Sequence, residues 1–162
     1  MPKPSLVACY SMTGNTRRIA DEVTIALQAD GEDIREPHPR RGLAGVLRAL
    51  FDALTRREPP IESIRRDPSD YELLVLCGPV WAGRLASPLR SYARQHAAKA
   101  RRIAFLCTEG GRGGEHAFAE LSNLCDRTPE ATLAITAEQI KNANYHEAVQ
   151  RFVSSLLPTK LT

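Results

Sequence analysis

The sequence predicts a three-layer α/β domain, in which helices cover both faces of a doubly wound parallel sheet. Three observations lead to this fold class. Apolar runs of strand length alternate with helix-patterned stretches along the whole chain. The two clearest runs, 71–77 and 103–107, are almost continuously apolar, as expected of strands buried on both faces. Polar or glycine-rich loops follow three of the strands, and such loops meet at one edge of a parallel sheet.

Taken in order, each element has its own signal. The apolar run 6–10 predicts the first strand. Apolar residues at helical spacing begin after the loop 11–16, and Asp30-Gly31 is expected to end that helix because glycine suits a left-handed C-cap. A weak, polar edge strand is expected at 33–36, closed by Pro37. The remaining predicted elements are helix 43–54, strand 71–77 with exit loop 78–84, helix 88–99, strand 103–107 with exit loop 108–114, a helix through 117–124, strand 131–136 and helix 145–157.

Helix 43–54 has the most pronounced amphipathic pattern. Its apolar stripe consists of Leu43, Val46, Leu47, Leu50, Phe51 and Leu54, and Arg48, Asp52 and Arg56 fall on the opposite face. We expect the stripe to pack on the protein's own sheet; the alternative is that it faces a second subunit.

Composition limits the classes of function. The 162 residues are expected to form one domain, 1–162, with 43% hydrophobic and 25% charged residues. A net charge of +3 without a long basic block does not indicate nucleic-acid binding. There is no signal-peptide layout or run of membrane-spanning length, and the four cysteines lack C-x-x-C or zinc-ligand spacing. A cytoplasmic protein without a metal site or membrane association is therefore expected.

The loop 11–16 lies between the first strand and the first helix, where free backbone N–H groups and the helix dipole favour an anion. It lacks the G-x-x-x-x-G-K-[ST] pattern of nucleotide triphosphatases. It nearly matches the Cys-x5-Arg pattern of tyrosine phosphatases after Cys9, but Asn15 stands where the arginine would be. Hydroxyls and backbone amides suit a phosphate that is held rather than transferred; an ordinary helix cap is the alternative.

This loop, Ser11-Met12-Thr13-Gly14-Asn15-Thr16, resembles the phosphate loop of the flavodoxin-like FMN-binding family. Segment 70–83 is similar to that family's third strand and first flavin loop, and segment 108–114 to its second flavin loop. The resemblance covers most of the chain. It implies a five-stranded sheet of order 2-1-3-4-5 with noncovalently bound FMN.

The resemblance also implies the cofactor-binding residues. The phosphate would be bound by Ser11, Met12, Thr13, Gly14, Asn15 and Thr16. The ring would be contacted by Pro79, Val80, Trp81, Ala82, Gly83, Thr108, Glu109, Gly110 and Gly111. Stacking on Trp81 and close approach of glycine backbone agree with this assignment, although Trp81 has a structural alternative as a core or surface residue. No catalytic residue is assigned.

Two departures bear on function. Electron-carrier flavodoxins are typically acidic, whereas this chain is basic, and the loop 108–114 has no second aromatic residue to cover the flavin. The expected function is electron transfer by FMN, with a redox partner protein. The alternatives are an NAD(P)H-dependent quinone or flavin reductase and a non-catalytic module that binds FMN or another phosphorylated ligand. A monomer or a homodimer fits either function.

Other side chains are weaker candidates. Arg84, Arg112 and Glu109 are expected near the flavin edge, and His116 close enough to donate a proton, although each also fits a solvent-facing position. Three cysteines are expected side by side at the ends of neighbouring strands as buried thiols, with a redox or metal cluster as the alternative: Cys9, Cys77 and Cys107.

Overall fold

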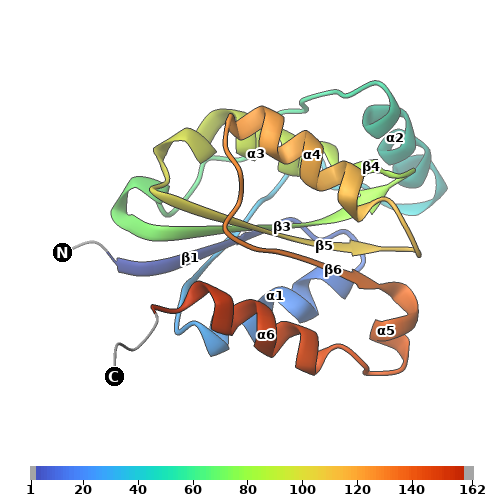
Figure 1. The fold of residues 1–162 in the computed structure, drawn as a ribbon. Helices are drawn as coiled ribbons and strands as arrows, with labels where there is room; N and C mark the ends of the chain where they lie inside the picture. The colour runs from blue at the N-terminus through green and yellow to red at the C-terminus, as the bar shows by residue number, and fades with distance from the viewer. Residues whose placement is uncertain (1–2, 159–162) are drawn as a thin grey trace.

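A computed structural model describes residues 3–158 and shows a parallel sheet between two layers of helices (Figure 1). The sheet has the order β2-β1-β3-β5-β6. Since β4 is a short strand beside β3, this is the predicted order 2-1-3-4-5, which is confirmed. The strands are β1 (Lys3–Cys9), β2 (Asp30–Asp33), β3 (Tyr71–Trp81), β4 (Arg84–Leu85), β5 (Arg102–Glu109) and β6 (Thr132–Thr136).

Helices cover both faces of the sheet. In Figure 1, α1 and α6 lie below the sheet, and α2, α3 and α4 lie above it. The helices are α1 (Asn15–Ala26), α2 (Gly42–Leu54), α3 (Ser87–His96), α4 (Gly114–Cys125), α5 (Ala137–Lys141) and α6 (His146–Leu156), with 3-10 turns η1 (Pro68–Asp70) and η2 (Ala97–Lys99). The predicted helix 88–99 therefore ends as a 3-10 turn, and α5 was not predicted.

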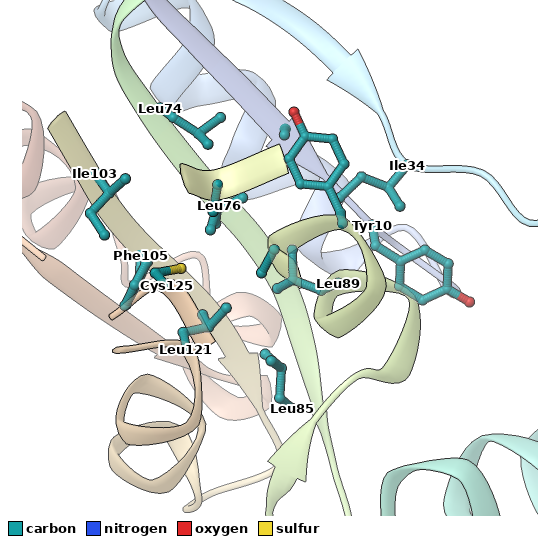
Figure 2. Packing of buried hydrophobic residues seen from close by; sticks show 14 of the residues in the cluster. Tyr10, Ile34, Leu74, Leu76, Leu85, Leu89, Ile103, Phe105, Leu121 and Cys125 are labelled. Carbon is teal, nitrogen blue, oxygen red and sulfur yellow. The ribbon is translucent and has the colours of Figure 1, made fainter. Parts of the chain in front are cut away.

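The core consists of two clusters, one on each face of the sheet. Along β3, Leu74 and Leu76 face the α3–α4 layer, while Leu73 and Val75 face the α1–α6 layer. Figure 2 shows the first cluster, where Leu76 and Phe105 lie against side chains from α3 and α4. Burial on both faces explains why the central strands are almost continuously apolar.

Two predictions for the first crossover are wrong. The helix α1 ends at Ala26, and Gln28, with φ 51°, takes the left-handed position expected at Gly31. Asp30 already belongs to β2, which pairs with β1 from Leu6↔Asp30 to Cys9↔Asp33. The strand therefore begins three residues before the predicted 33–36. An edge strand is held by backbone hydrogen bonds, so its polar sequence gives little indication of where it begins.

The segment predicted as the loop 78–84 is mostly a hairpin. Strand β3 continues to Trp81 and β4 returns antiparallel, with Trp81 paired to Arg84. Ala82 and Gly83 connect them with φ values of 49° and 71°. Two successive positive φ values are typical of a type I′ turn, the turn that matches the twist of a hairpin. The hairpin holds Trp81 at the carboxyl end of β3.

The predicted packing of α2 is wrong. All six large side chains of its stripe are exposed, and its buried residues are Gly45, Ala49, Asp52 and Ala53. A Cβ on Gly45 would lie 2.7 Å from the backbone carbon of Arg40, so the helix approaches the preceding segment too closely for large residues. Asp52, expected on the solvent side, is only 4% exposed.

Within residues 3–158, no helix is long and apolar enough to cross a membrane. The same residues contain no cluster of three or more His, Cys, Asp or Glu side chains able to hold a metal ion.

Candidate functional site

A pocket of about 250 Å³ lies at the carboxyl ends of β1, β3 and β5. Ten of the fifteen predicted residues line it: Met12, Thr13, Asn15, Thr16, Pro79, Val80, Trp81, Thr108, Glu109 and Gly110. The five that do not are Ser11, Gly14, Ala82, Gly83 and Gly111. The 11–16 segment and the carboxyl ends of β3 and β5, which are far apart in the sequence, therefore meet around one cavity.

The pocket also has two residues that sequence reasoning missed. Ala137 and Ile140 line it from α5, which follows β6 directly. The sequence does carry one signal for this helix, because Thr136 and Gln139 form a capping box at its start.

The predicted phosphate loop leaves the start of α1 open. Gly14 is the N-cap residue, with φ 95°, and it has no side chain to cap the helix. Its N–H donates to Ser11 Oγ at 3.1 Å, so Ser11 shapes the loop instead of capping α1. A Cβ on Gly14 would meet nothing within 4 Å. The start of α1 therefore lacks a side-chain cap, which contradicts the ordinary helix-cap alternative, and a helix N-terminus of this kind favours an anion.

A buried hydrogen bond joins the first loop to β5. The hydroxyls of Thr16 and Thr108 are 2.6 Å apart, and both residues are buried. These two positions are separated by 92 residues in the sequence. Such a bond fixes the start of α1 against the end of β5 and thereby sets the width of the pocket at that point.

The loop after β5 packs against the hairpin. A Cβ on Gly113 (φ 111°) would lie 2.9 Å from Gly83 Cα, so only glycine permits this contact. The Glu109 carboxylate accepts a hydrogen bond from the N–H of Gly114 at 2.5 Å, at the start of α4. The Glu109 charge is therefore stabilised by a helix N-terminus.

A buried polar network contacts the Trp81 ring through Tyr10 and Arg40. The ring contacts Tyr10 edge-on, with centroids 5.6 Å apart, and the Arg40 guanidinium carbon lies 5.2 Å from the Trp81 centroid. Arg40 donates to Glu36 at 2.9 and 3.0 Å and pairs with Asp52 at 2.8 Å.

Tyr10 belongs to the same network, because its hydroxyl donates to Glu36 at 3.0 Å. Burial, and next the neighbouring Glu36 charge, raise the pKa of Tyr10 above its usual value, so the phenol stays protonated. No pattern in the sequence indicates this network.

Arg84, at the start of β4, contacts two residues of α4, His116 and Glu120. The Arg84 guanidinium is 3.2 Å from His116 Nε2 and 3.5 Å from the Glu120 carboxylate. Glu120 is also paired with the buried Arg90 at 2.5 Å. Arg112 is exposed in the loop after β5. Arg84 would have to leave its ion pair with Glu120 to take the predicted position at a flavin edge.

The predicted thiol cluster is only partly formed. Cys9 and Cys77 are paired in register between β1 and β3 and belong to the core of the α1–α6 face. Cys107 belongs to the opposite core, so it is not beside them. All four cysteines are free and buried, and burial raises the pKa of Cys9 to about 12. We therefore expect these thiols to be unreactive in the folded protein.

No family model and no curated protein matches this sequence. Several solved structures do match the fold. A Bacteroides uniformis protein assigned as a flavoprotein is 16% identical, with a TM-score of 0.76 over 95% of this chain and 99% of its own. A flavoprotein from Lactobacillus acidophilus, whose structure is a complex with FMN, is 18% identical, with a TM-score of 0.68 over 86% and 97%.

A flavodoxin associated with a bacterial microcompartment is 12% identical, with a TM-score of 0.54 over 97% of this chain and 100% of its own. At such identities the likeness concerns the fold. The sheet order, the helical layers and these neighbours together show that the chain has the flavodoxin-like fold.

Proposed function

We propose that this protein binds FMN noncovalently in the pocket at the carboxyl ends of β1, β3 and β5, and that it acts in electron transfer. The observation that carries the proposal is the convergence of the 11–16 segment with the carboxyl ends of β3 and β5 around one cavity, beside a helix start without a side-chain cap. The FMN complex of the Lactobacillus acidophilus flavoprotein, which has the same fold, supports it. The free thiols agree with a reducing cytoplasm as its compartment.

The residues present fit this cofactor. The N–H groups that begin α1, with Thr13 and Asn15 beside them, would hold the phosphate. Trp81 and the backbone at Gly110, where a Cβ would meet nothing within 4 Å, would bind the ring. When bound, FMN supplies reversible uptake and release of electrons.

The chain's own residues prepare the site for that ligand. Tyr10 and Arg40 fix the orientation of Trp81, so its ring is a preformed flat surface. The Thr16–Thr108 bond keeps two walls of the pocket in place, and the Glu109 charge is bound by the start of α4. A rigid site of this kind loses little conformational entropy when a ligand binds.

A second function has a specific observation in its favour. Trp81 is the one aromatic residue among those that line the pocket, so no second aromatic side chain is present there to cover the other face of the ring. Together with the basic charge of the chain, this favours an NAD(P)H-dependent reductase of a quinone or another small acceptor. Steady NAD(P)H oxidation with a quinone supports the reductase, whereas reduction only by a partner protein supports the carrier.

The visible spectrum of the purified protein, followed by titration with FMN and with riboflavin, tests the binding proposal. Asn15→Asp places a negative charge beside the phosphate, so we expect FMN affinity to fall at least about tenfold while riboflavin affinity is unchanged. Asn123→Asp adds the same charge to the exposed surface of α4 and should change neither affinity. A colourless protein that fails to bind added FMN would refute the proposal.

A further inference from the structure

Helix α2 carries an apolar surface that nothing in the described chain covers. Six of the eight large apolar side chains that are exposed within residues 3–158 belong to this one helix, at 38% to 76% exposure. They form a patch on the order of 600 Å², at the upper end of what monomers expose and close to the roughly 800 Å² that each partner of a standard interface buries. The members are Leu43, Val46, Leu47, Leu50, Phe51 and Leu54.

The patch has the geometry of a helix-packing surface. Leu43, Leu47 and Phe51 form one row at four-residue spacing, and Val46, Leu50 and Leu54 form a second, parallel row. The groove between such rows accepts a row of the same kind from another helix, crossing at about −50°. The surface is about 20 Å long and complementary to itself.

We propose that α2 forms the centre of a homodimer interface, in which it packs against α2 of a second copy of this chain around a two-fold axis. A two-fold contact requires only one patch on each subunit, and this chain provides one. The proposal does not depend on FMN binding.

The charges of α2 favour a second copy over other partners. The helix has only two charged residues, Arg48 and Asp52, and their opposite charges give it no net charge. Arg48 donates to Glu36 at 3.2 Å, and Asp52 is paired with Arg40. Between Gly42 and Leu54 the helix therefore lacks the cationic face by which amphipathic helices bind anionic lipid, and the exposed Arg41, Arg56 and Arg57 lie beyond its ends.

The apolar rows also lack the charged side chains that steer a transient redox partner. A charge-depleted, apolar centre is typical of homodimer interfaces. Arg57, whose guanidinium carbon lies 5.3 Å from the Phe51 ring, provides a polar rim at one end of the patch.

Sedimentation equilibrium of the full chain, with and without FMN, tests the proposal. We expect twice the chain mass of 17.9 kDa, and one chain mass for the variant Leu47→Glu/Leu50→Glu. Ile25→Glu is the matched control, because Ile25 is 78% exposed on α1 but isolated, and it should leave the dimer intact. Circular dichroism checks that each variant is folded.

A disulfide test locates the axis. Leu50→Cys lies near the middle of the patch, where a two-fold axis brings each residue close to its own copy, so mild oxidation should yield a covalent dimer. The native cysteines are buried and give no background. Ile25→Cys should stay monomeric on a denaturing gel. A wild-type monomer overturns the proposal, including one that sediments with anionic vesicles. A dimer that persists in the double variant Leu47→Glu/Leu50→Glu also overturns it.

Discussion

Replacing Arg40 with methionine removes the cation at the centre of the network behind Trp81. The Arg40 side chain is 0% exposed, and its carboxylate partners Glu36 and Asp52 are 2% and 5% exposed. Removing one member of a buried ion pair costs about 3–5 kcal/mol, because the remaining charge is left uncompensated. Arg48 still contacts Glu36 at 3.2 Å, so we expect a loss near 3 kcal/mol.

Urea denaturation measures this loss directly, and thermal unfolding should show a Tm lower by about 6–12 °C for a chain of this size. Arg94→Met is the matched control, because the Arg94–Glu58 pair is 3.0 Å long but exposed and should contribute less than about 1 kcal/mol. The single tryptophan adds a local readout, since the near-UV circular dichroism of Trp81 should change in Arg40→Met and not in Arg94→Met. Equal losses in the two variants would refute the reasoning.

Three further predictions concern other parts of the fold. The cysteines should react with Ellman's reagent only after unfolding, because burial raises their pKa, to about 11 even for Cys125; rapid reaction of the native protein would contradict this. Burial, and then Lys99, lower the pKa of His96, so the unfolded state binds the proton more readily and stability should fall as pH drops below about 6.5. Over that range, the slope of the denaturation midpoint against pH should be shallower for His96→Gln than for the unaltered protein. Ala82→Gly should stabilise the hairpin by about 0.5–1 kcal/mol, since Ala82 has a φ of 49°, whereas Ala119→Gly in the exposed face of α4 should destabilise by a similar amount in the same urea assay.

The sheet and most of the pocket could be predicted because their signals are local. The runs of β3 and β5 are apolar at nearly every position, and the loops that follow them occupy the carboxyl edge in any parallel sheet. The individual residues of the 11–16 loop were assigned through its resemblance to the phosphate loop of the flavodoxin-like family, and four of them line the pocket. The hairpin that holds Trp81 was missed because Ala82 is an unusual residue for a left-handed turn position.

The network behind Trp81 could not be predicted, because its members are distributed between Tyr10 and Ser87 and its charged members look like ordinary surface residues in the sequence. Charged side chains are mostly exposed, so the sequence alone favours an exposed Arg40. Its burial is explained only by the carboxylates that surround it in the structure. Only tertiary structure brings the carboxylates to it.

The same network explains why α2 is oriented opposite to its pattern. Asp52 must face inward to pair with Arg40, and Gly45 must lie against the Arg40 backbone, which places Ala49 and Ala53 on the inner face as well. Because 3.6 residues make one turn, burying these four positions directs the leucine rows outward. The ion pair that orients Trp81 and the apolar surface proposed for dimerisation are thus two faces of one helix. The small, charged inner face of α2 buries little apolar area, and contact between the outer rows of two copies would add the apolar burial that this face does not supply.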